Sequence, residues 1–450
     1  MSREVPHLRA LTALAISLVS IIAMLSVVVW VDWRYPVAGD GHYLFATARS
    51  LAFDGDLDLG NQYRVLGDRW GLGRDPSGDG WRLPPREIGP ALAMLPGLWL
   101  HHIGGFDPHW EPAMACLLAA GSLGPTWLLC VRIVATTLPS SARSAAPEAL
   151  ASAACLGFVV PFYAVGRSAY PHALDALACA WLVSTLIERE REASPKPTLY
   201  LGLAFSFAVL VRLQNCLWLL WPLTSWIRAA YLRHRNGDPG GDPDRDEPRP
   251  SDLDGHSPSV PIRAGVSLAV AGLGVALGLS PQAWLNLAHP GSRAGAIRWQ
   301  AEFFDLQDLP TDLLRVLAGE HGLVSWTPIA ALALVGLGVA LRRQPTARRV
   351  ALVGGALWLL FACVRDVDGG DAFGARRFAG YTGALALGLG WLWARVRPPT
   401  PDPLDSPATG ARRTRALAWI LAGLAMSATV WNLSRVGRAI GGALSLRADR

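Results

Sequence analysis

The chain has 450 residues, of which 51% are hydrophobic and only 17% are charged. Soluble domains usually carry about 25% charged residues, so this composition excludes an ordinary soluble protein. The formal net charge of +6 comes almost entirely from arginine, with Lys196 as the only lysine. These arginines lie in loops beside apolar blocks, as membrane topology requires, which argues against a nucleic-acid-binding protein.

Four long blocks without any charged residue predict an integral membrane protein, since a bilayer core requires about 20 apolar residues per helix. They lie between Arg9 and Asp32, between Glu111 and Arg132, between Arg263 and Arg293, and between Glu320 and Arg342. The first block ends in Trp30, Trp33 and Tyr35, which is typical of an interfacial anchor rather than a cleavable signal. All six cysteines lie in or beside apolar segments, so no disulfide framework is expected.

We expect an all-α, multi-pass bundle, because unpaired backbone groups are not tolerated in lipid. The apolar pattern predicts eleven spans, at 10–31, 113–132, 149–166, 173–187, 198–212, 214–228, 264–286, 322–341, 350–364, 378–394 and 416–433. Arg212 alone interrupts the block 197–227, which predicts a tight helical hairpin there. We find no internal repeat, which disfavours a transporter built from two similar halves.

The apolar segment 88–100 decides the topology of everything after it. It is short and contains Pro90 and Pro96. If it spans the membrane, the arginine-rich segments 342–349 and 395–415 lie outside; if it lies at the interface, both are cytoplasmic, as the positive-inside rule favours. We therefore predict a juxtamembrane helix over 88–103. The arginine-rich C-terminal tail disagrees with this topology.

Three polar segments complete the expected organisation as one membrane domain. Residues 32–87 form a large first outer loop, rich in Asp, Gly and Arg. Residues 229–262 and 397–411 are rich in proline and predict cytoplasmic linkers, the first of them disordered.

Asp40 follows the first span closely, near the outer membrane surface. The residues after it have helical periodicity, from His42 to Phe53, with Tyr43 on one side. A carboxylate at this place is suited to deprotonating a sugar hydroxyl as a general base. The alternative is a helix-capping Asp with no chemical role.

Three arginines near the outer surface are candidates for binding a phosphate. Arg86 precedes the juxtamembrane helix at headgroup depth, where it either meets a lipid phosphate or anchors the interface. Arg376 and Arg377 stand together in the outer loop 365–377, against the positive-inside rule, at a helix start. The alternative for this loop is internal pairing of its Asp and Arg residues.

Further ionisable residues lie near the outer ends of spans. Asp175 and His172 lie at the mouth of the fourth span, and Arg212 lies at the turn of the hairpin. Such residues are functional candidates, although an Asp175–Arg212 ion pair that joins helices is an equal alternative. The outer loop 287–321 ends in His321 and is suited to an acceptor site. No metal-ligand spacing is present, so the sequence requires no cofactor, while a divalent cation is compatible with it.

Taken together, four segments resemble the C-type glycosyltransferases, membrane enzymes that use polyprenyl-phosphate sugars. The nearest groups in kind are the protein O-mannosyltransferases, the lipid A aminoarabinose transferase and the rhizobial core galacturonosyltransferases. The segments are Gly39-Asp40-Gly-His42-Tyr43-Leu with Asp54-Gly-Asp56-Leu-Asp58, Arg86-Glu-Ile-Gly89-Pro with Leu95-Pro96, His321-Gly-Leu-Val-Ser-Trp326-Thr-Pro328, and Gly369-Gly-Asp-Ala-Phe373-Gly-Ala-Arg376-Arg377.

The resemblance implies that Asp40 activates the acceptor and that Arg376 binds the donor phosphate. Many relatives have Glu where this chain has Gly41, so Asp54 or Asp56 is a candidate substitute for the missing carboxylate. We regard His42, Tyr43, Asp175, Arg212 and His321 as supporting residues.

The expected function is therefore transfer of a sugar, with inversion, from a polyprenyl-phosphate donor to a glycan, lipid or protein acceptor. The expected location is the bacterial inner membrane, with the site outside the cytoplasm. Because the leaving phosphate is already ionised, a base and fixed positive charge suffice for one in-line displacement. The alternatives are a transporter or lipid flippase of the cell envelope, and a structural membrane subunit.

Overall fold

The computed structural model describes residues 4–68, 80–138, 146–191, 196–236, 259–289, 306–364, 373–396 and 408–448. In these residues the regular elements are helices, with no strand among them. The prediction of an all-α chain is therefore confirmed for the described part.

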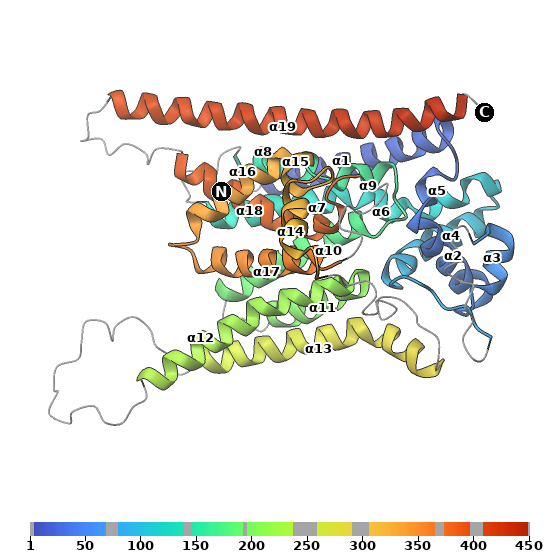
Figure 1. Cartoon of the computed structure of the whole chain (residues 1–450), viewed down its shortest axis with the longest axis horizontal. Helices are drawn as coiled ribbons and strands as arrows, with labels where there is room; N and C mark the ends of the chain where they lie inside the picture. Colours follow the sequence, from blue (N-terminus) through green and yellow to red (C-terminus); the bar gives the residue numbers. More distant parts are fainter. Residues whose placement is uncertain are drawn as a thin grey trace.

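The longer helices run in opposite directions between two ends of one bundle (Figure 1). The α-helices are α1 (Glu4–Trp30), α2 (Asp40–Arg49), α3 (Gly60–Leu66), α4 (Gly89–Gly104), α5 (Glu111–Ala115), α6 (Leu117–Gly121), α7 (Leu123–Thr137), α8 (Ala146–Leu156), α9 (Val160–Val165), α10 (His172–Arg191), α11 (Lys196–Val211), α12 (Leu220–Asn236), α13 (Ser259–Ala288), α14 (Leu309–Ala318), α15 (Leu323–Trp326), α16 (Pro328–Ala340), α17 (Pro345–Ala362), α18 (Thr382–Val396) and α19 (Ala408–Ala448). Short 3-10 helices are η1 (Tyr35–Val37), η3 (Pro108–Trp110), η5 (Leu213–Leu219) and η9 (Arg376–Tyr381), and η2 (Ser50–Asp54) is a π-helix.

Four helical segments of the described part are long and apolar enough to cross a membrane, which supports an integral membrane protein. They are Pro6–Trp30, Leu117–Thr136, Ile262–Ala288 and Ala416–Gly442. A fifth is present if Leu309–Trp326 and Pro328–Ala340, which meet at a bend of 103°, form one span. All eleven predicted segments coincide with helices. However, several of these helices are short, such as the 11-residue α8, so these criteria do not support eleven spans.

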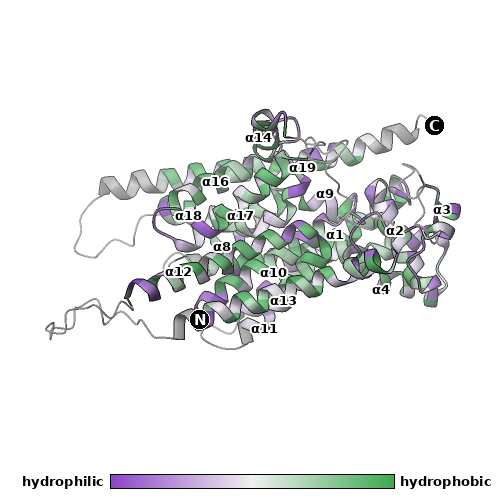
Figure 2. Cartoon of the chain, turned by 60° about the horizontal axis from the view of Figure 1, so that its bottom comes forward, coloured by the Kyte–Doolittle hydropathy of each residue, from purple (hydrophilic) through white to green (hydrophobic). Residues whose placement is uncertain are grey.

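The bundle encloses one large hydrophobic core, to which α7 to α11 and α16 to α18 contribute most of the side chains. A second cluster joins the end of α1 to α2, α4, α5 and α6. In Figure 1 the elements α2 to α5 gather at one end of the bundle, and α19 and α13 run along its two sides. Figure 2 shows hydrophobic residues along the whole bundle and a more mixed hydropathy in α2 and α3.

One expected break and one expected helix are found. Arg212 has an extended backbone (φ −152°, ψ 124°) and separates α11 from η5, where the break was predicted. The predicted tight hairpin is not formed, because α11 packs on α10 and α13 rather than on α12. The predicted helix over 88–103 is α4, which begins with a proline in its first turn and ends before Gly105 in a left-handed conformation.

The linker prediction was wrong at its edges. α12 continues to Asn236, because no proline or glycine interrupts 229–236, and α13 already begins at Ser259. Pro261 falls in the first turn of α13, where a missing N–H is harmless. α19 likewise begins at Ala408, inside the second predicted linker; the remainder of both linkers lies outside the described residues.

Candidate functional site

Asp40 and two of the predicted phosphate-binding arginines meet at the end of the bundle that carries α2 and α4. Arg86 donates from Nη2 to Asp40 Oδ1 at 2.6 Å, and Arg376 lies with Nη1 3.4 Å from Asp40 Oδ2. The three side chains are 20%, 32% and 15% exposed for Asp40, Arg86 and Arg376. The carboxylate is thus clamped between two cations at a site that solvent still reaches.

Tyr170 fixes the start of α2 and was missed by sequence reasoning. Its hydroxyl accepts the backbone N–H of Asp40 at 3.1 Å, so the Asp40 backbone is tied to the loop before α10. The guanidinium carbon of Arg376 lies 5.6 Å from the centre of the Tyr170 ring, within cation–π range. The only signal in the sequence was the position of Tyr170 two residues before His172.

Gly41 leaves no room for a side chain at this position. A Cβ atom at this position would lie 2.8 Å from Ala169 Cβ, closer than real Cβ contacts. Ala169 cannot easily withdraw, because its N–H donates to the carbonyl of Pro36 at 3.1 Å. The packing of the loop before α10 against the loop after α1 therefore disfavours any larger residue at position 41.

Asp54 and Asp56 form hydrogen bonds within the segment 32–87 and are not brought to Asp40. Asp54 Oδ2 accepts hydrogen bonds from the amides of Asn61 and Gln62. Asp56 Oδ1 accepts from the Ser50 hydroxyl at 2.7 Å and from the backbone N–H of Asp58 at 3.2 Å. Neither carboxylate therefore replaces the missing second carboxylate in this structure.

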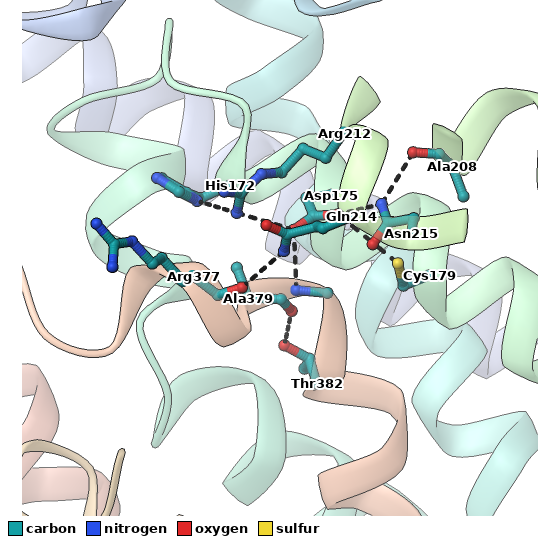
Figure 3. Close-up of polar contacts among 11 residues, drawn as sticks. His172, Asp175, Cys179, Ala208, Arg212, Gln214, Asn215, Arg377, Ala379 and Thr382 are labelled. Atoms are coloured by element: carbon teal, nitrogen blue, oxygen red, sulfur yellow. Dashed lines mark hydrogen bonds and ion pairs between the residues drawn. The ribbon is translucent and has the colours of Figure 1, made fainter. Parts of the chain in front are cut away.

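Asp175 lies in the first turn of α10 and is fully buried. Its Oδ1 accepts from the Asn215 amide at 2.7 Å, and its Oδ2 accepts from the backbone N–H of Gly380 at 3.1 Å (Figure 3). Arg212 Nη1 lies 3.5 Å from Oδ2, so the predicted ion pair is present. Asp175 thereby joins α10, η5 and the turn η9, which begins at Arg376.

Two further features fix the turn that carries Arg376 and Arg377. Gly374 adopts φ +60°, and a Cβ there would meet Trp326 Cδ1 at 2.5 Å, so only glycine fits. Gln214, from η5, donates to the carbonyl of Arg377 at 2.9 Å. In Figure 3 the guanidinium of Arg377 points away from Asp175. Residues 365–372 of the predicted loop lie outside the described part.

The remaining supporting residues lie around this centre. His42 Nε2 lies 2.6 Å from the carbonyl of Gly67, and the buried Tyr43 donates to Asp68 at 2.9 Å, so both stabilise the first outer loop. His172 is buried, with Nδ1 3.3 Å from Arg212 Nη1. The rings of His321 and Trp326 stack with their centroids 4.8 Å apart, and the Trp326 ring in turn lies against Gly374, just before the turn that carries Arg376.

The electrostatic balance of the site favours an anion. Arg86, Arg212, Arg376 and Arg377 all act electrostatically on His172, and among the described residues the carboxylates paired with these arginines are Asp40 and Asp175. Burial raises the pKa of Asp40, but Arg86 and Arg376 lower it by more, so the net pKa lies below the ordinary value of 3.8. Arg86 Nε is moreover buried without a hydrogen-bond partner among the described residues, so one donor remains available.

A cavity of about 190 Å³ opens beside Arg86, between α11, α13 and the start of α4. It is lined mainly by apolar side chains, and its polar lining residues are Glu87 and Gln282. Both polar atoms of the Gln282 amide are buried without a partner among the described residues. The cavity thus adjoins the arginine clamp and is suited to an apolar chain that begins at a polar group.

Among the described residues, no group of three or more His, Cys, Asp and Glu side chains is arranged to hold a metal ion. In comparisons with known proteins, no protein family matches the chain, and no curated protein matches it significantly.

Proposed function

We propose that the chain is a membrane glycosyltransferase that moves a sugar from a polyprenyl-phosphate donor to a glycan, lipid or protein acceptor, with inversion. The observation on which this depends is the clamp of Asp40 between Arg86 and Arg376. A base and a phosphate-binding cation pair are the two parts that this displacement requires. They come from segments separated by 46 and 336 residues.

In the proposed reaction the donor phosphate takes over the two arginines from Asp40. Asp40 removes the proton of an acceptor hydroxyl, whose oxygen bonds to the anomeric carbon of the sugar. The bond between that carbon and the phosphate oxygen breaks on the opposite face, and the polyprenyl phosphate leaves with the electron pair. Charge-assisted contacts from the guanidinium groups stabilise the leaving phosphate.

This exchange of partners also activates the base. In the free protein the two arginines keep the pKa of Asp40 low, which makes it a weak base. A phosphate bound to the same arginines offsets their charge, so the pKa of Asp40 rises when the donor is present. Donor binding and base activation are therefore coupled through one pair of side chains.

The membrane setting supports the same proposal. The apolar cavity beside Arg86 is suited to the first part of an isoprenoid chain. We propose that all eleven predicted segments cross the membrane, because the shorter α10, α11, α16 and α18 pack against one another and beside α13. We further propose a C-type transferase bundle with α4 at the interface, located in a bacterial inner membrane with Asp40 outside the cytoplasm. The proposed reaction requires no cofactor, and a divalent cation is compatible with it.

The test is turnover of radiolabelled polyprenyl-phosphate hexoses and pentoses by the purified protein in lipid, with mixed acceptor glycans. We expect Asp40→Asn to reduce transfer about 10²–10⁴-fold, the usual contribution of a general base. Asp32→Asn is the matched control, because Asp32 is exposed just after the end of α1 and its carboxylate accepts the backbone N–H of Arg34. Equal turnover by wild type and Asp40→Asn would falsify the base role. Absence of donor binding and consumption would favour a transporter, to be assayed by lipid flux.

A further inference from the structure

A second charged pocket lies at the opposite end of the bundle from Asp40. It has a volume of about 570 Å³ and is lined by the end of α10, by α12, and by the beginnings of α13 and α17. Its inner wall includes the buried side chains of Leu186, Leu201 and Trp221. Because α10 rises about 1.5 Å per residue, Arg189 lies roughly 25 Å from the start of that helix near Asp40. One headgroup therefore cannot occupy both sites.

The lining of this pocket is strongly basic. Among the described residues it includes five arginines and one glutamate, a formal charge of +4. The arginines are Arg189, Arg191, Arg228, Arg263 and Arg349.

Glu190 does not neutralise this set, because it is already engaged. Its Oε1 accepts the indole N–H of Trp221 at 2.8 Å and a hydrogen bond from Arg349, and its Oε2 lies 3.5 Å from the Thr346 hydroxyl. The carboxylate thus ties α10 to α12 and α17. It offsets the charge of one arginine only.

Two of the other arginines are brought together rather than separated. Arg189 Nε donates to the Ser267 hydroxyl at 3.0 Å, and its Nη2 donates to the carbonyl of Arg263 at 3.4 Å. Burial and the charge of Arg263 lower the pKa of Arg189, as expected for like charges held close together. An anion in the pocket would relieve this repulsion.

The surroundings of the pocket point to a lipid as the source of that anion. On α12 and α13, beside the arginines, the apolar side chains of Ile227, Tyr231, Ile262 and Val266 are exposed. The apolar segment of α13 begins at Ile262, so the arginines lie at the edge of the membrane-crossing region. Phosphate oxygens would meet the guanidinium groups there while acyl chains cover the exposed apolar residues.

We propose that this pocket binds the phosphate headgroup of an anionic phospholipid in the leaflet opposite the Asp40 site. Binding holds the ends of α10, α12, α13 and α17 together at a point where their arginines otherwise repel. The proposal does not depend on the glycosyltransferase function.

The test uses the purified full-length protein in detergent, with phosphatidylglycerol, phosphatidylcholine or inorganic phosphate as the probe. Retained lipid is measured by native mass spectrometry, and stabilisation by the thermal unfolding midpoint. We expect phosphatidylglycerol to bind and to raise the midpoint, and Arg228→Gln/Arg263→Gln to bind it about 30-fold more weakly, since each of the two arginines contributes about 1 kcal/mol near an anionic surface and about 1.4 kcal/mol is a factor of ten. Both side chains are exposed, so folding is not at risk.

The matched control is Arg342→Gln/Arg343→Gln, which removes the same charge from the exposed end of α16 at the same end of the bundle. This variant should bind phosphatidylglycerol as the wild type does. Equal weakening in both double variants, or equal binding of phosphatidylcholine, would overturn a specific anionic site. Equal stabilisation by inorganic phosphate alone would overturn the lipid as its occupant.

Discussion

Asp40 and Asp175 are both carboxylates beside arginines at the same end of the bundle, yet their surroundings differ. Asp175 is fully buried and accepts hydrogen bonds from a backbone N–H, an amide and an arginine. Asp40 is 20% exposed, and among the described residues its carboxylate oxygens contact the partly exposed side chains of Arg86 and Arg376. A buried carboxylate with fixed donors is a structural anchor, whereas an accessible one with exchangeable partners is suited to chemistry.

The largest effect that separates the two carboxylates is expected from Asp175→Ala. This change leaves Arg212 partly buried without its counter-charge and removes the acceptor for the Gly380 N–H. We expect the free energy of unfolding to fall by about 3–5 kcal/mol, as for other broken buried pairs. Denaturation in mixed micelles measures the free energy of unfolding, and Asp40→Asn is the comparison variant. A variant of Asp175 that is as stable as wild type would contradict the anchoring role.

A somewhat smaller effect is expected from the arginine clamp. Arg376→Gln removes a donor aimed at the leaving phosphate, so kcat should fall about 10²–10³-fold while the protein remains folded. Arg376→Lys should recover part of the loss, since it keeps the charge but not the bidentate geometry. Arg377→Gln should have the smaller effect, because it is Arg376 that lies against Asp40, with Nη1 3.4 Å from Oδ2. Equal kinetics for both glutamine variants would contradict this assignment.

The smallest effect concerns pH. The pKa of Asp40 is below 3.8 in the free protein, so the base stays ionised, and its ion pairs stabilise the fold, above that ordinary value. Both contributions are lost as the pH falls through the lowered folded-state pKa. In Arg86→Gln the pKa should rise, so the acid limb of kcat/KM should move to higher pH. An unchanged acid limb in that variant would show that Asp40 is not the titrating base.

The sequence alone predicted the positions of the helices well. Apolar blocks free of charge, the break at Arg212 and the helix over 88–103 were all found as helices or as a break between them. These features depend on local periodicity and on the exclusion of charge from apolar segments, which are readable along the chain. The linker edges at 229–236 and 259–262 were predicted wrongly, because 229–236 contain no helix breaker and because a proline is tolerated in the first turn of α13.

The sequence by itself therefore determined the class of protein and named Asp40, Arg86 and Arg376 as residues of interest. The tertiary structure alone decided that these three meet, that Ala169 occupies the space beside Gly41, and that Tyr170 and Asn215 support the site. Helix periodicity encodes which face is apolar but not which distant segments pack together. Contacts across 130 to 336 residues arise only when the whole bundle closes.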